Sequence, residues 1–481
     1  MPSFGRSEIY TAERVITSAN IQKALAKALP VFNKNRNEIR HLRNVYRGKQ
    51  CILDRIKRIR PEINTRVVLN HANEIVSFKV SYLLSEPIKY TSRGRRKEAT
   101  DDIAVLNEFM HVNSKSAHDK MIADDFSIGG TAYRMPRPNP NYNGMDDEAP
   151  FIDYVLDPDK TFVVRSASIG HKVMLGVVME SEVDEDGRPY NIVCCYTDKE
   201  YFEVNCSMKD GKAGEIIFRE PHSLGMVPII EYINNDARLG AFELVESILE
   251  AINELQSDRI NGTIQTVQSL MIFKNCEVDK QGFQEIKDMG AVQIKSSQGL
   301  DSNISLLSPE LNQTDQQVLL DSLYDELLNI VGMPAKNANN NNSSNNGAAI
   351  MSAGWYAADA RAKDTETLWK CSENDYLRVV LRICREMGVL NMNLSDIDMK
   401  FTRRNYEDLL VKTQSLTNML QAGIDPAKAI EHCGAFTDPN DVYESSRLYL
   451  QKWVYSDEDE RLPEDSEEDD KPDPEQDGDD R

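Results

Sequence analysis

Two long helical segments on either side of a short insertion constrain this chain more than any other feature. The first segment follows Gly240 and repeats apolar residues at helical spacing. These residues are Val245, Ile248, Leu249, Ile252 and Leu255. The second segment starts near Asn312, stops at Gly332–Pro334 and carries the apolar residues Val318, Leu319, Leu323, Leu327, Leu328 and Val331. The insertion has strand-like ends around a helical turn, so the pattern predicts two helices joined by a small compact insertion.

The first helix also carries an acidic stripe on the face opposite its apolar residues. The acidic residues are Glu243, Glu246, Glu250, Glu254 and Asp258. Paired carboxylates can perform acid–base catalysis, but this repeat is longer and more regular than a catalytic pair. We therefore interpret the stripe as a solvated surface.

Between Gly130 and Glu220 the pattern changes to short apolar or alternating runs separated by Pro, Gly, Asn and Asp, which predicts β-strands. Cys194 and Cys195 fall inside one of these strands and should point to opposite faces. We interpret them as packed residues, since adjacent cysteines are poorly placed for a disulfide. Residues 1–66 are predicted to be helical, and Ser92–Asp102 is predicted to be a mobile charged loop.

Charge is distributed unevenly along the chain, whose net charge is −22. Residues 457–481 hold 15 acidic and 3 basic side chains, whereas residues 33–66 hold 11 basic and 3 acidic ones. An acidic protein is a poor general DNA binder, because affinity for a duplex depends on neutralising phosphates. For the basic run we favour a solvated helix face over a dedicated nucleic-acid patch.

Several function classes lack the residues that they require. The sequence contains no GxxxxGK[ST] loop for nucleotide phosphates, no HExxH and no GxSxG. The seven histidines are dispersed, so we expect no metal site, no cofactor and no catalytic residue. The eight scattered cysteines indicate reduced thiols in a cytosolic setting. A membrane span is not expected either, since the sequence has no apolar run of about 18 residues.

After Pro334 the chain becomes rich in asparagine. Seven of the eleven residues from 337 to 347 are Asn and none is charged, which predicts a flexible loop. A long helix is then predicted from Ala348 to Met387. Its first part, Ala353–Ala362, is rich in small residues, which suits close packing between subunits.

Towards the C-terminus, Asp425 followed by Pro426 predicts the N-terminus of a shorter helix. From Asp457 onward the chain contains almost no apolar residue. We expect this acidic tail to be disordered, because it has almost nothing to bury.

Six motifs follow one another along the chain. They are VYRGK (45–49), NHANEIVSFKVSYLLSEPIKY (70–90), FSIGGTAY (126–133), HSLGMVPIIEYINND (222–236), AINELQSD (251–258) and FTRRNYED with AGIDPAKAI (401–430). Each motif is degenerate, but their order resembles the portal proteins of tailed double-stranded-DNA phages of the siphophage type. The resemblance covers roughly residues 46–449.

The resemblance implies an α+β fold of the portal type, with an α/β wing, a two-helix stem, a small α/β clip, a long kinked helix and a helical crown. The wing is expected at 1–237, the two stem helices at 238–269 and 311–334, and the clip at 270–310. A tunnel loop at 335–347, the long wing helix at 348–389, the crown at 390–456 and the disordered tail at 457–481 complete the expected boundaries.

The resemblance also implies a ring, usually of twelve copies, at one capsid vertex, through which double-stranded DNA is packaged and ejected. Expected partners are the terminase large subunit, a head-completion or adaptor protein, and the major capsid and scaffolding proteins, without a membrane. The protein would occupy the virion, and the host cytoplasm during assembly. The tunnel-loop residues expected to contact DNA are Lys336, Asn337, Asn339, Asn340, Asn341, Asn342, Asn345 and Asn346. The acidic stripe from Glu243 to Asp258 is expected to face the channel and to repel phosphates.

Two alternatives remain open from the sequence. One is a metal-dependent DNA-processing enzyme that uses the carboxylates between Glu243 and Asp258. The other is a head–tail adaptor ring that is not a portal. The particle mass separates them, since a ring of about a dozen copies favours the portal and a monomer with metal-dependent cleavage favours the enzyme.

Overall fold

The computed structural model of this chain contains helices and sheets in two units, Met1–Arg404 and Asn405–Arg481. It describes residues 5–58, 61–93, 97–145, 147–183, 189–207, 212–267, 270–274, 303–307, 313–334, 354–403, 409–436, 439, 442–443 and 445–446. This mixture of helices and sheets confirms the α+β fold class.

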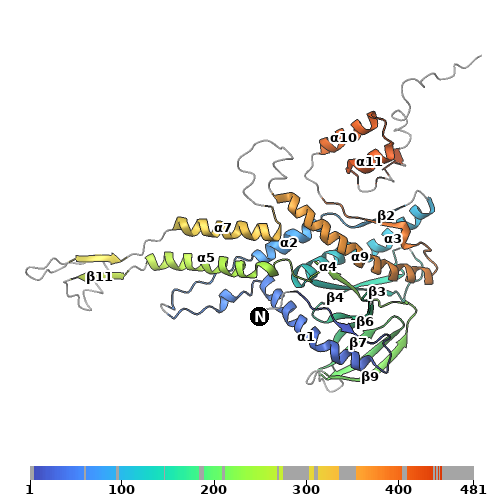
Figure 1. The fold of residues 1–481 in the computed structure, drawn as a ribbon, viewed down its shortest axis with the longest axis horizontal. Helices are drawn as coiled ribbons and strands as arrows, with labels where there is room; N and C mark the ends of the chain where they lie inside the picture. Colours follow the sequence, from blue (N-terminus) through green and yellow to red (C-terminus); the bar gives the residue numbers. More distant parts are fainter. Residues whose placement is uncertain are drawn as a thin grey trace, which may run out of the picture. The chain divides into compact units, whose positions relative to one another are not determined.

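A six-stranded sheet in the first unit has the order β1-β5-β6-β7-β8-β9, and helix α1 (Ile21–Tyr46) covers one of its faces (Figure 1). The strands are β1 (Tyr10–Thr11), β5 (Thr161–Ser166), β6 (Val173–Val183), β7 (Pro189–Tyr196), β8 (Glu200–Ser207) and β9 (Lys212–Pro221). β1 runs parallel to β5, and the other neighbours are antiparallel. Leu25 and Phe32 of α1 are buried against the sheet, because the apolar residues of this helix share one face.

The adjacent cysteines of β7 lie on opposite faces of this sheet. Cys195 packs with Val177 and Phe202 on the face that α1 covers. Cys194 packs with Val178 and Ile192 on the other face. The alternation of side chains along a strand produces this arrangement, and the prediction that the two cysteines point apart is confirmed.

A three-stranded antiparallel sheet in the order β10-β3-β4 lies against the largest apolar core. Its strands are β3 (Thr131–Pro138), β4 (Phe151–Leu156) and β10 (Ile230–Ile233). The helices around it are α2 (His71–Leu83), α3 (Lys97–Val112), α4 (Lys115–Gly129) and α9 (Tyr356–Glu386). Trp369 and Tyr376 of α9 meet Phe126 of α4 and Tyr232 of β10 in this core. The long helix is thereby fixed to the sheet along its buried face.

A smaller antiparallel pair joins distant parts of the first unit. β2 (Lys89–Ser92) pairs with β13 (Ile397–Lys400), which follows a single 3-10 turn, η5 (Leu394–Asp396). The end of the first unit therefore returns to a strand that lies some three hundred positions earlier in the sequence.

Two predictions about the N-terminal part of the chain were wrong. Residues 1–66 are not helical throughout, because β1 precedes α1 and only the 3-10 turn η1 (Cys51–Asp54) follows it. Ser92–Asp102 is not simply a charged loop, because Ser92 ends β2 and helix α3 begins at Lys97. Ile103 and Leu106 are buried on one side of α3. This burial stabilises a helix whose first turn is charged, and local composition does not reveal it.

The two predicted stem helices are present. α5 (Glu246–Val267) follows the 3-10 turn η2 (Glu243–Val245), and α7 (Gln313–Val331) lies beside it (Figure 1). The guanidinium of Arg259 donates to the side-chain oxygen of Gln317 at 2.5 Å across this pair. β11 (Leu270–Lys274) and β12 (Asn303–Leu307), the described ends of the insertion, form an antiparallel pair. The strand-like ends predicted for the insertion are therefore confirmed.

The second unit contains helices α10 (Leu409–Gln421) and α11 (Pro426–Cys433), which pack against each other. The side chain of Asp425 accepts hydrogen bonds from the backbone N–H groups of Ala427 and Lys428 at 3.0 and 3.2 Å. Pro426 follows at the first helical position, where a missing N–H costs nothing. The predicted helix N-terminus is confirmed.

The space around Gly130, which follows the last residue of α4, can be tested by substitution. Its φ is +85°, and an added Cβ would lie 2.1 Å from the carbonyl oxygen of Arg238. Gly144 has a similar φ of +76°, but an added Cβ there meets no heavy atom within 4 Å. Gly144→Ala should therefore cost only the left-handed backbone penalty, about 1–2 kcal/mol. Gly130→Ala should cost a further ~1–3 kcal/mol because Arg238 must move.

Urea unfolding of the two variants and the unsubstituted protein measures this difference. Equal midpoints for Gly130→Ala and Gly144→Ala would mean that the Arg238 carbonyl does not restrict position 130.

Candidate functional site

An extended stretch of the chain is attached to helix α5 by a ladder of buried side chains. Asn253, Ser257 and Asn261 of α5 are almost completely buried. They accept hydrogen bonds from the backbone N–H groups of residues 69, 67 and 65, at 2.7, 2.9 and 2.7 Å. Four helical residues advance about 6 Å, and two extended residues advance about 6.6 Å. The two periods match closely enough for every rung to form.

The acidic stripe predicted on this helix is only partly exposed. Glu250, Glu254 and Asp258 are exposed, while Glu246 is half-buried. Glu246 lies 2.5 Å from the Nε2 atom of His41. Asp258 lies 2.9 Å from both Arg55 and Lys57. The negative charge of Asp258, at one end of the stripe, is therefore neutralised within the subunit.

Glu243 does not belong to the exposed stripe, which corrects the prediction made for it. Its side chain is buried, and its carboxylate accepts hydrogen bonds from the backbone N–H groups of Gly5 and Gly240 at 2.9 and 2.8 Å. Arg6 adds an ion pair at 2.6 Å. These donors attach the N-terminal segment to the turn before α5, so Glu243 cannot face a channel.

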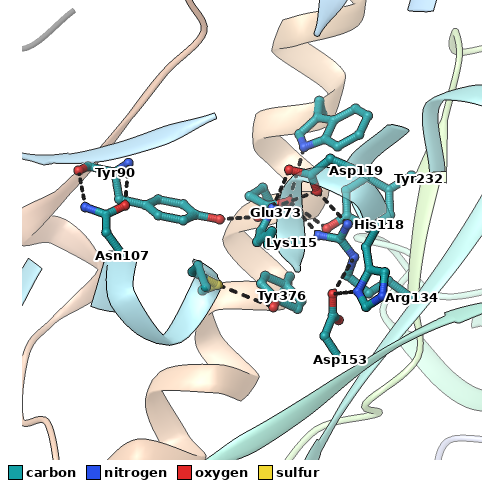
Figure 2. Close-up of polar contacts among 12 residues, drawn as sticks. Tyr90, Asn107, Lys115, His118, Asp119, Arg134, Asp153, Tyr232, Glu373 and Tyr376 are labelled. Carbon is teal, nitrogen blue, oxygen red and sulfur yellow. Dashed lines mark hydrogen bonds and ion pairs between the residues drawn. The ribbon is translucent and has the colours of Figure 1, made fainter. Parts of the chain in front are cut away.

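A cluster of buried charges lies where α4, β3, β4 and α9 converge (Figure 2). Glu373, near the middle of α9, is completely buried and lies 2.9 Å from the amine of Lys115. Lys115 also contacts Asp119 at 2.7 Å. Arg134 is completely buried too, and its Nη2 donates to Asp119 at 2.5 Å. Its Nε and Nη1 lie 3.5 Å from Asp153 and 3.7 Å from Glu373.

Neutral donors complete the environment of Glu373 (Figure 2). The hydroxyls of Tyr90 and Tyr232 donate to its carboxylate at 2.5 and 2.7 Å, and the indole N–H of Trp369 donates at 3.1 Å. Burial alone would raise the pKa of Glu373, but Lys115 and Arg134, together with the Tyr90 hydrogen bond, hold it below its ordinary value. Burial and the neighbouring carboxylate raise the pKa of Tyr232, so its hydroxyl stays a donor. The cluster therefore keeps a buried carboxylate ionised, which describes a structural junction.

The imidazole of His118 extends this cluster towards the surface. Its Nδ1 lies 3.0 Å from the buried carboxylate of Asp153 (Figure 2). Without His118, three carboxylates face the two cations Lys115 and Arg134. His118 therefore supplies a further polar partner to the buried carboxylate of Asp153.

The basic run at 33–66 uses much of its charge inside the subunit. Arg36 and Arg40 lie 3.6 and 2.8 Å from Asp159. Arg43 binds Asp125 and Asp157, at 3.1 and 2.7 Å. These pairs attach α1 to neighbouring elements, which supports a structural role for the run over a nucleic-acid patch.

The whole of the predicted tunnel loop, and the acidic tail, lie outside the described residues. This applies to Lys336, Asn337, Asn339, Asn340, Asn341, Asn342, Asn345 and Asn346, and to residues 457–481. Within the part of the chain that the structure describes, no three His, Cys, Asp or Glu side chains group closely enough to hold a metal ion. None of the helices there combines the length and the apolar character that crossing a membrane requires.

The contact predicted for the small residues of Ala353–Ala362 needs a correction at one position. Ala358 is buried within its own subunit. Ala357 and Ala360 are exposed on the same helix. Ala358 therefore cannot meet a neighbouring subunit directly.

The buried cluster was missed by sequence reasoning, although a signal for it exists. Glu373 interrupts an apolar face formed by Trp369, Tyr376 and Leu377, at helical spacing. A charged residue on such a face must find partners, because burying an unpaired charge is costly. The sequence does not reveal which distant cations supply them.

The Arg134 guanidinium is the best position at which to test the cluster. Arg134→Met leaves Asp119 and Glu373 with Lys115 and removes the guanidinium beside Asp153. Removing one partner of a buried pair typically costs about 3–5 kcal/mol. Arg378→Met removes an exposed pair with Asp375 on the surface of α9 and should cost less than about 1 kcal/mol.

Chemical denaturation of both variants compares these losses of unfolding free energy. A similar small loss for Arg134→Met and Arg378→Met would show that the buried cations do not hold the junction together.

Comparison with known families gives one match. The model of the family described as "Phage portal protein, SPP1 Gp6-like" matches residues 26–471. This range takes in most of α1, the helices α5 and α7, the buried cluster and most of the second unit. A comparison with curated proteins finds no match.

Proposed function

Because the chain belongs to the SPP1 Gp6-like family of phage portal proteins, we propose that it forms a ring-shaped channel at one vertex of a phage capsid. Double-stranded DNA passes through this channel during packaging and ejection. The family is structural and not enzymatic. The protein's contribution is accordingly geometric, and an ATP-driven motor must be supplied by a partner.

The observation that carries this proposal is the length of the family match, which includes nearly every element of the described structure. The antiparallel pair α5 and α7, with paired strands β11 and β12 in the insertion between them, supports a stem that ends in a clip. The proposed boundaries are those expected from the sequence. The clip, at 270–310, is the proposed docking surface for the terminase large subunit and later for a head-completion protein.

Exposed apolar side chains on the stem support assembly into a ring. Val318 and Leu319 of α7 are 63% and 51% exposed, and Leu244, just before α5, is 62% exposed. Apolar residues that the subunit leaves in water are suited to contact another copy. A head-to-tail contact that is repeated around an axis closes a ring. Twelve copies is the number that we propose.

The exposed carboxylates of α5 fit a channel wall. Glu250 and Glu254 are exposed and carry no basic partner among the described ion pairs. In the proposed ring they face the lumen, where like charge keeps the phosphates of DNA from adhering. The asparagine-rich loop at 335–347 then provides the constriction that touches DNA.

Particle mass tests the ring. Native mass spectrometry of the purified protein should show a closed ring of about a dozen copies. Val318→Asp should shift the population to smaller species, because it places a charge in the contact between copies. Ile169→Asp is the matched control, since Ile169 is fully exposed in the turn between β5 and β6.

If Val318→Asp forms normal rings, α7 does not take part in the contact between copies. Loss of rings from both variants would show that the added charge acts on solubility and not on the interface.

The proposed tunnel loop can be tested through its charge. Replacing Asn339, Asn340, Asn341 and Asn342 by Lys should leave rings intact but slow DNA packaging, most strongly at low salt. Lysines bind phosphates through counterion release, whereas a neutral hydrogen bond contributes only about 0.5–1.5 kcal/mol and exchanges easily with water.

The same four positions changed to Ser provide the control, because serine keeps neutral donors and acceptors. Packaging rates measured across a range of salt concentrations separate the two variants. An unaltered rate for the lysine variant at every salt concentration would place the loop away from DNA.

A further inference from the structure

A small pocket with two basic residues lies beside the start of α9. Its volume is about 50 Å³, and it is enclosed by α2, α4, α9 and the end of α7. Phe78, Tyr82 and Phe126 provide apolar and aromatic walls, and Ser127 adds a polar group. The charged residues in its lining are Lys79 of α2 and Arg361 of α9.

Neither cation has a carboxylate partner among the described residues. The amine of Lys79 makes no ion pair or hydrogen bond in this part of the chain. Arg361 is exposed, and its Nη1 donates to the backbone carbonyl of Ile330 at 2.7 Å. Nearby acids are already engaged, since Asp359 and Glu366 both bind Arg403, at 3.1 and 2.9 Å.

Lys79 is half-buried and Arg361 is exposed, and their like charges disfavour each other. Burial, followed by the charge of Arg361, lowers the pKa of Lys79 to about 8. The lysine still carries its charge at neutral pH, so the free subunit holds two like charges together. An anion that enters the pocket relieves both the repulsion and the desolvation.

The backbone is adapted to this arrangement. Gly332 ends α7 with a φ of +70°, and an added Cβ would lie 2.5 Å from the Cδ and Nε atoms of Arg361. The missing side chain at Gly332 leaves room for Arg361 to pass across the end of α7 and reach Ile330.

We propose that this pocket receives one side-chain carboxylate from a second copy of the chain, an inference that rests on the proposed ring. A pocket of about 50 Å³ has room for only a few atoms, since one water needs about 10–15 Å³ on the same measure. A carboxylate at the end of a flexible side chain fits this space, and its methylene groups pack on Phe78 and Tyr82. A duplex phosphate, held between two sugars, cannot enter as deeply. The chain supplies such groups in excess, with 78 acidic against 56 basic side chains.

Lys79→Met tests the proposal through two opposite effects. It removes a charge that the free subunit leaves without a partner, so the urea midpoint of the monomer fraction should stay unchanged or rise. In the ring the same change leaves a carboxylate without one of its cations. Dissociation between copies should become about tenfold easier or more, and rings should separate at a lower salt concentration.

Two control variants distinguish the effect of the Lys79 charge from the effect of its shape and from the effect of removing any lysine. Lys79→Arg keeps the charge and should retain most of the ring stability. Lys23→Met removes an exposed lysine that is paired with Glu13 on the surface, and it should leave both the monomer and the ring unchanged.

Several results overturn the proposal. Rings of Lys79→Met that dissociate like the unsubstituted ones would show that no carboxylate enters the pocket. Equal weakening by Lys79→Arg and Lys79→Met would point to shape and not to charge. Intact rings that lose only their retention of DNA would identify a phosphate as the anion. If the unsubstituted chain forms no ring, the proposed function fails as well, and that result is recognised because every protein in the series behaves alike.

Discussion

The ionised carboxylate of Glu373, completely buried on α9, is the interaction on which the centre of the first unit depends. Its partners come from β2, α4, β3 and β10, so one side chain joins elements that are distant in the sequence. A buried charge is tolerated only when its donors are in place, because desolvation exceeds any single attraction. The cluster therefore allows one relative placement of the long helix and the sheet. Apolar packing around Trp369 then adds stability to that placement.

Many charged side chains of the described residues form ion pairs within the subunit. Arg43 and Arg40 of α1 bind aspartates of neighbouring elements, and Arg55 binds Asp258 of the stem. A basic run that looks available for nucleic acid in the sequence is thereby engaged. The groups left on α5, such as Glu254, are exposed carboxylates. In the proposed ring, an acidic protein of this kind lines a channel without an affinity for DNA over its whole surface.

The sequence pattern predicted correctly those features that depend on interactions between residues close together in the chain. The periods of α5 and α7, the strands between Gly130 and Glu220 and the Asp425 helix N-terminus are confirmed, because spacing and capping act over a few residues. Glu243 was placed on the wrong surface, because its donors Gly5 and Arg6 come from the other end of the unit. The cluster around Glu373 was missed for the same reason, since partners far along the chain leave no trace in local spacing.

The ladder between α5 and residues 65–69 has a mechanical consequence. Its rungs at Asn253, Ser257 and Asn261 recur every four helical residues, about 6 Å apart, so the helix cannot creep along its partner by small amounts. A shift of one residue rotates all three polar side chains away. The backbone N–H groups of residues 65, 67 and 69 then lose their acceptors together. The helix can therefore slide only in discrete steps. The next position at which two of the hydrogen bonds form is four helical residues away. The mismatch of about 0.6 Å per rung also limits the length of such a ladder, since further rungs would fall out of phase. In the proposed ring, a stem held in this way resists sliding along residues 65–69.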